Sequence, residues 1–151
     1  MGIVNWVQLT LAAPVVPRSN VRMTSSERAR VASEILATYV LVRWWLIRLD
    51  FHTTVEAARG VRTSLQAHED ATSAALRLGI AVDRTLRRMP LDTRCLVRSL
   101  VLTRLLARRG IGSTFVIGVR AKPEFAAHAW LERDGVALLP TGPEFHPITE
   151  L

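Results

Sequence analysis

The chain has 151 residues, 49% of them hydrophobic, which is enough for one domain with a buried core. Its single cysteine excludes an internal disulfide, and four scattered histidines do not make a structural zinc cluster, so we expect no metal, no cofactor and a reducing, cytoplasmic location. The net charge is +7, but the basic residues are spread along the chain without a dense run, which argues against nucleic-acid binding.

The first seventeen residues carry no charge, yet they predict neither a signal peptide nor a membrane-spanning helix. A positive segment is missing at the start, and polar residues and Pro14 interrupt a run that is shorter than the roughly 20 apolar residues a spanning helix needs. We therefore expect no stable membrane insertion. Residues 1–22 are interpreted as an extended arm that packs on the domain or on a partner.

Residues 23–89 are predicted to be helical. Thr24-Ser25-Ser26-Glu27 has the spacing of a capping box, and a long helix should follow as far as Asp50. Trp44 and Trp45 are expected to widen its apolar stripe, and a core role is favoured over a groove or membrane contact because Arg43 and Arg48 interrupt the segment. The stripe recurs every three or four residues and consists of Val31, Ile35, Tyr39, Val42, Leu46 and Leu49.

Two shorter helices are predicted between Asp50 and Pro90. One spans Thr53 to Arg59 and ends at Gly60, and the other spans Ser73 to Met89, where Pro90 cannot continue it. The segment from Val61 to Thr72 is predicted to be a loop. Together with residues 90–151, which form the predicted catalytic core, this helical part makes a single domain of residues 23–151.

Cys95 is predicted to lie in the first turn of a further helix. Asp92 or Thr93 can cap that turn, and its free N–H groups, the helix dipole and the flanking arginines favour a thiolate, which is a nucleophile. Ser99 follows one turn later on a face that should be buried, and the helix should end at Gly110. The alternative is that Cys95 is simply a small buried apolar residue.

After Gly110 the pattern alternates as in strands. Ser113 to Arg120 and Phe125 to Arg133 are expected to be strands, and His128 shares one face of the second with Trp130 and Glu132. Asp134-Gly135 predicts a two-residue hairpin, after which Val136 to Leu139 should return antiparallel. Three prolines, Pro140, Pro143 and Pro147, predict an irregular tail.

A thiol at a helix start and a later histidine on a strand suit acyl chemistry through a thioester. The histidine takes the thiol proton and later protonates the leaving amine, while N–H groups around Cys95 can donate to the oxyanion. The order of cysteine helix, strand, histidine strand and hairpin describes the papain and transglutaminase core. We therefore predict an α+β fold in which a cysteine-bearing helix packs on a small antiparallel sheet, with Cys95 and His128 as catalytic residues.

Five segments of the second half of the chain carry a resemblance to a known family. They are Arg94-Cys95-Leu96-Val97-Arg98-Ser99-Leu100, Leu105-Leu106-Ala107-Arg108-Arg109-Gly110, Ile117-Gly118-Val119, Ala127-His128-Ala129-Trp130-Leu131-Glu132 and Asp134-Gly135. Together they resemble the leader peptidases of lasso peptide biosynthesis, which are transglutaminase-like cysteine proteases. The resemblance covers about residues 90–139 and implies the standalone peptidase half of the split maturation B protein. It also implies that Cys95 is the nucleophile and His128 the general base.

The resemblance also implies a substrate and partners. The substrate is the leader region of a ribosomally made precursor peptide, and a separate leader-recognition protein is required. A lasso cyclase then joins the freed amine to an acidic side chain. The same fold can instead transfer acyl groups to amines, or serve as a non-catalytic scaffold that holds these proteins together, and both alternatives stay open.

One position departs from the family pattern. The family often has an aspartate twelve residues after the histidine, and this chain has Pro140 there. The predicted hairpin register pairs Arg133 with Val136, Leu131 with Leu138, and His128 with Thr141. The Thr141 hydroxyl, or a nearby backbone carbonyl, is then predicted to accept from the imidazole N–H and fix its tautomer.

Overall fold

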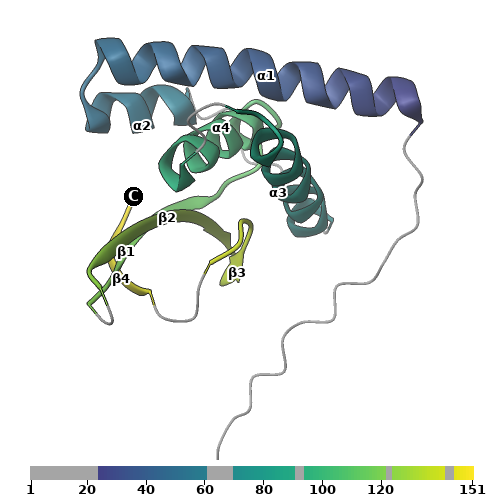
Figure 1. Ribbon diagram of the computed structural model, residues 1–151. Helices are drawn as coiled ribbons and strands as arrows, with labels where there is room; N and C mark the ends of the chain where they lie inside the picture. The colour runs from purple at the N-terminus through teal and green to yellow at the C-terminus, as the bar shows by residue number, and fades with distance from the viewer. Residues whose placement is uncertain (1–23, 61–69, 91–93, 122–123, 142–144) are drawn as a thin grey trace, which may run out of the picture.

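The computed structural model describes residues 24–60, 70–90, 94–121, 124–141 and 145–151, so the predicted arm of residues 1–22 lies outside the described residues. Within these ranges, helices precede one antiparallel sheet, and the helices lie on one side of it (Figure 1). The elements are α1 (Ser25–Arg48), α2 (Phe51–Arg59), α3 (Ala71–Arg87), α4 (Cys95–Ala107), β1 (Thr114–Arg120), β2 (Ala126–Arg133), β3 (Val136–Ala137) and β4 (His146–Glu150).

The capping box of α1 and the end of α2 at Gly60 are as predicted, whereas the Asp50 cap of α2 was not predicted. The Thr24 hydroxyl accepts from the N–H of Glu27, whose carboxylate accepts from the Thr24 N–H at 2.7 Å, which completes the capping box. Asp50 caps α2 by accepting from the N–H of Thr53 at 3.0 Å, and Gly60 ends that helix at a φ of 63°. Helix α3 begins at Ala71, two residues before the predicted start.

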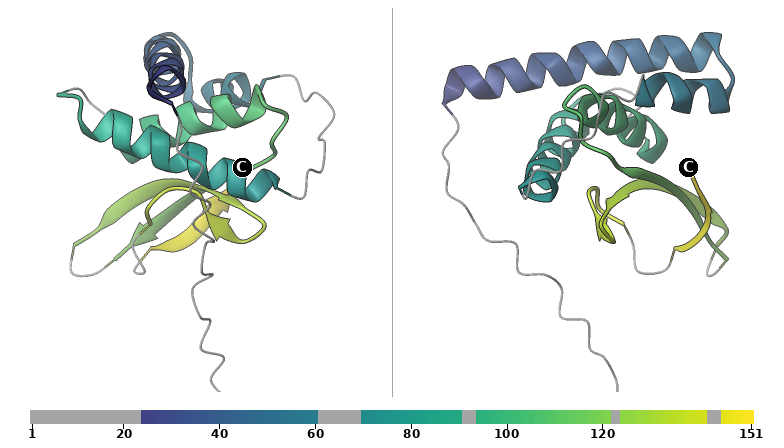
Figure 2. Two further views of the ribbon diagram at one scale, coloured as in Figure 1. Left: turned by 90° about the vertical axis from the view of Figure 1, so that its right-hand side faces the viewer. Right: turned by 180° about the vertical axis from the view of Figure 1, so that it is seen from behind.

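Helix α4 is the central helix of the domain. It contacts α1, α2, α3 and β2, two further views show α1 on the side of α4 away from the sheet (Figure 2), and most side chains of α4 are buried. The predicted α+β class, with a cysteine-bearing helix on a small antiparallel sheet, is therefore confirmed. The core that surrounds the helix includes Ile35 and Val42 of α1, Val82 and Leu86 of α3, Phe115 of β1 and Leu131 of β2.

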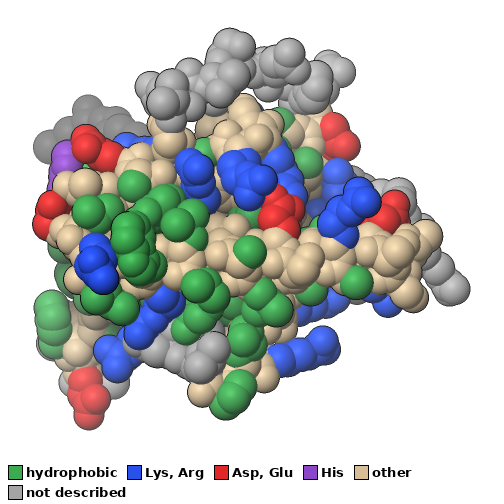
Figure 3. All heavy atoms as spheres, turned by 90° about the horizontal axis from the view of Figure 1, so that it is seen from above, with side chains coloured by type: hydrophobic (Ala, Val, Ile, Leu, Met, Phe, Trp, Pro, Cys, Tyr) green, Lys and Arg blue, Asp and Glu red, His purple; other side chains and the backbone are tan. Residues whose placement is uncertain are grey.

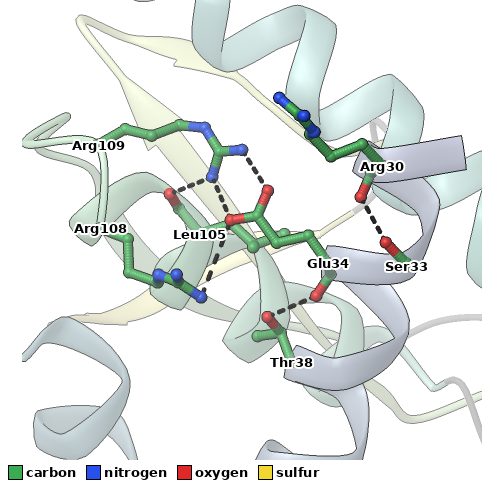
Figure 4. Close-up of polar contacts among 7 residues, drawn as sticks. All are labelled: Arg30, Ser33, Glu34, Thr38, Leu105, Arg108 and Arg109. Carbon is green, nitrogen blue, oxygen red and sulfur yellow. Dashed lines mark hydrogen bonds and ion pairs between the residues drawn. The ribbon is translucent and has the colours of Figure 1, made fainter. Parts of the chain in front are cut away.

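An ion-pair cluster ties the end of α4 to α1. The carboxylate of Glu34 accepts from Arg109 at 2.6 and 3.2 Å, and the Arg108 guanidinium lies 3.9 Å from it (Figure 4). Arg109 also donates to the carbonyl of Leu105 at 2.9 Å. This cluster orients α1 across α4 and engages the Glu34 carboxylate within the molecule.

One prediction about α1 is wrong. Ile35, Tyr39 and Val42 are buried as expected and Trp45 packs against the core, but Trp44 is exposed. Successive residues of a helix are rotated by about 100°, so Trp44 lies about 200° from Val42 while Trp45 lies only about 60° from it. The stripe therefore widens toward Trp45 alone.

The sheet has the order β3-β2-β1-β4, and its last strand corrects a second prediction. The chain after Pro140 was expected to be irregular, but β4 pairs antiparallel with β1, with Pro147 opposite Gly118. A proline has no N–H to donate, and it is tolerated on an edge strand because a backbone N–H that faces solvent makes no bond within the sheet. The register of the β1–β4 pair shifts between Ile117 and Gly118, at the position of this proline.

Candidate active site

Cys95 is the first residue of α4, as predicted, and follows Arg94 at the N-cap position. The first backbone bond of the helix runs from the N–H of Arg98 to the carbonyl of Arg94 at 3.2 Å, so the N–H groups of residues 95–97 precede the helical ladder. The thiol is half-buried. Arg94 makes no side-chain cap bond, and the predicted caps Asp92 and Thr93 lie outside the described residues.

His128 lies in β2, as predicted, opposite Gly118 of β1. Its Nε2 atom is 3.2 Å from the carbonyl oxygen of Pro140, and since a carbonyl only accepts, this hydrogen bond requires the proton on Nε2. The ring centroid lies 5.0 Å from that of Phe145 and 5.9 Å from that of Trp130. These contacts fix the ring plane, and the tautomer leaves Nδ1 able to accept a proton.

The hairpin after β2 has the predicted turn. Asp134 and Gly135 have φ values of 51° and 73°, as a two-residue turn with both central residues at positive φ requires. Arg133 pairs with Val136. The N–H of Leu138 donates to the carbonyl of Leu131 at 2.8 Å, which confirms the first two predicted pairs.

The third predicted pair concerns the acceptor for the imidazole. Strand β3 ends at Ala137, and the chain beyond it brings the Pro140 carbonyl to His128. Thr141 is exposed, and it is not among the described residues that line the cavity beside the histidine. Of the two predicted acceptors, a backbone carbonyl, that of Pro140, accepts a hydrogen bond from His128 in the structure. A role for the Thr141 hydroxyl stays a prediction.

One small cavity brings the two predicted catalytic residues together. Cys95 at the start of α4 and His128 on β2 both line it, although 32 residues separate them in the sequence. Pro140, which holds the histidine, lines the same cavity. The remaining residues of its lining are Asp83, Arg98, Ala129 and Leu139.

A buried hydrogen bond ties the cysteine helix to the histidine strand. Ser99, one turn after Cys95, is fully buried, and its hydroxyl donates to the carbonyl of Ala129 at 3.0 Å. Ala129 is the neighbour of His128 in β2. The sequence predicted that Ser99 lies on a buried face of its helix. It did not predict the hydrogen bond to Ala129, which is 30 residues away in the chain.

Asp83 of α3 was missed in the sequence. Its buried carboxylate lines the cavity, where it accepts from Arg98 at 3.1 Å and from Arg87 at 3.3 Å. The sequence did contain a sign that Asp83 is buried, because it lies among Leu78, Val82 and Leu86 on the apolar face of a helix. A carboxylate on such a face needs a charged partner inside the fold.

In the part of the chain that the structure describes, no helix has the length and apolar character needed to cross a membrane, and no group of His, Cys, Asp and Glu side chains is arranged to hold a metal ion.

A family model described as the transglutaminase-like superfamily matches residues 35–149, a range that contains Cys95, His128 and Pro140. No match was found among curated proteins or among solved structures.

Proposed function

Because the chain belongs to the transglutaminase-like superfamily, whose fold serves cysteine proteases and acyltransferases, we propose that it is a cysteine peptidase that removes the leader from a lasso precursor peptide. The observation that carries the proposal is the shared cavity of Cys95 and His128, with the histidine oriented by the Pro140 carbonyl. The resemblance of residues 90–139 to lasso leader peptidases supplies the substrate class. The proposed partners are a separate leader-recognition protein and, after cleavage, a lasso cyclase.

The proposed reaction begins with transfer of the thiol proton of Cys95 to Nδ1 of His128. The Cys95 sulfur then attacks the carbonyl carbon at the leader junction, and N–H groups at the start of α4 donate to the oxyanion. The imidazolium gives its proton to the nitrogen of the departing core peptide as the carbon–nitrogen bond breaks. This step leaves the leader as a thioester and the core with a free amine.

Water completes the proposed cycle. The neutral imidazole takes a proton from water as the oxygen attacks the thioester carbon, and the sulfur leaves as the thiolate. The imidazolium then returns its proton to the thiolate, and the leader acid releases its remaining proton to solvent as the carboxylate. The Pro140 carbonyl holds the Nε2 proton throughout. A neutral acceptor orients the ring but stabilises the imidazolium less than a carboxylate does, so we expect a slower enzyme than a relative with the aspartate.

Mass spectrometry of precursor incubated with this chain and the recognition protein tests the proposal. We expect the leader and core peptide as products with the wild type, and no products with Cys95→Ser, whose hydroxyl is far harder to ionise. His128→Ala should lose activity similarly, and the double variant should be little worse because the two groups act as a unit. Normal turnover by Cys95→Ser would contradict the proposal.

The same experiment separates the alternatives. Acyl transfer would give a product in which an added amine is joined to the leader, because both reactions pass through the same thioester. A scaffold would bind the precursor equally well with Cys95→Ala and yield no product under any condition. Either result would replace the peptidase proposal.

A further inference from the structure

The strand that carries His128 places an indole ring and a carboxylate in a row with it. His128, Trp130 and Glu132 alternate along β2, so their side chains share one face of the strand. The imidazole and the indole are stacked, with ring centroids 5.9 Å apart and an angle of 22° between the ring planes. The Nε1–H of the indole donates to the Glu132 carboxylate at 2.7 Å. A carboxylate is thus linked to the imidazole through the indole.

Trp130 is buried, but outside the core that surrounds α4. Its exposed fraction is 3%, and among the described residues that core includes the two neighbours Ala129 and Leu131 but not Trp130 itself. Because successive residues of a strand point to opposite faces, the indole is buried on the face that carries His128. Packing against α4 therefore does not explain where the indole lies.

Gly118 of β1 makes room for the indole beside the histidine. It pairs with His128 in the sheet, and a Cβ at this position would lie 2.6 and 2.8 Å from two carbon atoms of the Trp130 ring. These distances are too short for carbon atoms that are not bonded, so a larger residue would displace the indole. The glycine therefore allows the ring to lie against β1 next to the imidazole.

The indole is placed to stabilise the positive charge that His128 acquires. When Nδ1 takes the thiol proton of Cys95, the products are a thiolate and an imidazolium whose Nε2–H still donates to the neutral Pro140 carbonyl. A cation over the face of a tryptophan ring, within about 6 Å of its centroid, is attracted by the electrons of the ring. The stacked imidazolium meets this condition at 5.9 Å. A hydrogen bond to a carboxylate makes the ring more negative, because linked polar groups polarise one another.

The second ring beside the imidazole is not equivalent. The Phe145 centroid lies 5.0 Å from that of His128, at an angle of 35°, but the guanidinium of Arg120 already lies 5.4 Å from the same phenyl centroid. That cation draws on the electrons that an imidazolium would need. Phenylalanine also has no N–H through which a carboxylate could polarise it.

The charged side chains that line the cavity are engaged with each other. The carboxylate of Asp83 binds Arg98 at 3.1 Å through one oxygen and Arg87 at 3.3 Å through the other. A carboxylate shared by two guanidiniums does little to balance a further positive charge at His128. Among the described groups around the imidazole, the Trp130 ring is then the one arranged to do so.

We propose that Trp130 stabilises the imidazolium form of His128 by a cation–π interaction, and that Glu132 strengthens this interaction through the indole N–H. The pair supplies part of the stabilisation that a carboxylate would give in place of the Pro140 carbonyl. Trp130 acts through His128 and Glu132 acts through Trp130, so both are positioning residues. Their role in peptide cleavage rests on the proposed function, but the thiolate–imidazolium pair is measurable without a precursor.

Alkylation of Cys95 by iodoacetamide, followed by mass spectrometry, measures that pair. Cys95 is the single cysteine of the chain, so the modification reports on it alone. At about pH 6 an isolated thiol is almost wholly neutral and fast alkylation needs proton transfer to His128, whereas at about pH 10 the thiol ionises without the histidine. At about pH 6 we expect Trp130→Leu to slow alkylation by about ten-fold and Glu132→Gln by about three-fold. At about pH 10 both should react within about two-fold of the wild type.

Two matched variants control for the loss of an indole and of a carboxylate elsewhere. Trp44→Leu removes an indole that is 51% exposed on α1, where Figure 3 shows exposed hydrophobic side chains, and Glu150→Gln removes an exposed carboxylate of the same sheet. Neither should change the alkylation rate by more than about two-fold at either pH. Trp130→Phe, which keeps a ring without the N–H, should fall between the wild type and Trp130→Leu. Glu132→Gln is nearly isosteric and decides the matter if Trp130→Leu does not fold.

The results separate this role from simple packing and from the peptidase proposal. Equal slowing at both pH values, or unchanged rates in Trp130→Leu and Glu132→Gln at about pH 6, would overturn the role of the indole. The expected alkylation pattern without any cleavage of precursor by the wild type and the recognition protein would refute the peptidase and leave that role in place. Where the precursor is cleaved, both variants should lower kcat by similar factors with KM unchanged, and wild-type kcat in both would overturn the role.

Discussion

Replacing Ser99 by alanine tests whether one buried hydrogen bond aligns the two halves of the candidate active site. The Ser99 hydroxyl joins α4, one turn after Cys95, to the carbonyl beside His128 at 3.0 Å. Removing it should cost about 1 kcal/mol of unfolding free energy, the usual net value of one hydrogen bond. For a domain of this size the melting temperature should then fall by about 3 °C.

The effect of Ser99→Ala on catalysis should be larger than its effect on stability. Without the bond, the start of α4 and the histidine strand are free to shift relative to each other, and a displacement of about 1 Å can cost about a hundred-fold in rate. We expect kcat to fall by at least about ten-fold, with the affinity for the recognition protein unchanged. Steady-state cleavage of the precursor below the melting transition measures this.

Thr103→Val is the matched control for Ser99→Ala. Thr103 is also buried in α4, but its hydroxyl donates to the carbonyl of Ser99 within the same helix, at 2.9 Å. The substitution removes a bond of similar strength without touching the connection to β2, so stability should fall and kcat should stay within about two-fold. Equal losses of kcat in the two variants would refute the alignment argument.

Three further predictions concern the acceptor, the packing of α3 and a helix cap. Thr141→Val separates the two predicted acceptors: turnover within about two-fold of the wild type would mean that the Pro140 carbonyl alone orients the histidine, whereas a loss of about ten-fold or more would assign a role to the hydroxyl. Gly79→Ala should destabilise the fold by about 1–3 kcal/mol in urea titration, because a Cβ there would overlap the Leu138 carbonyl. Helix propensity alone favours alanine by about 1 kcal/mol, so a more stable variant would contradict this packing. Hydrogen bonds from the side chain and backbone of Thr53 hold the pKa of Asp50 below its ordinary value of 3.8. The ionised Asp50 cap therefore stabilises α2 fully above pH 3.8, and this stabilisation is lost as the pH falls through the lowered pKa. An asparagine at this position would still cap the helix, so in a pH titration by circular dichroism Asp50→Asn should keep the helix but lose the acid dependence. The same acid dependence in both proteins would contradict the assignment.

Local features of this protein were predictable from the sequence because they depend on neighbouring residues. The capping box at Thr24 and the end of α2 at Gly60 need only hydrogen bonds and dihedral angles within one turn. The Asp134-Gly135 turn sets the register of the hairpin, since both residues adopt positive φ. Cys95 at a helix start and His128 on a strand followed from the same kind of pattern.

Only the tertiary structure decided what surrounds these residues. The acceptor at His128 is a backbone carbonyl, which every residue has, so no side-chain pattern singles out Pro140. The bond from Ser99 to Ala129 and the approach of Asp83 to the cavity join segments whose separation in space depends on how α3 and α4 pack on the sheet. Packing is a property of the whole core, and a periodic pattern reports which face of an element is buried without reporting what that face meets.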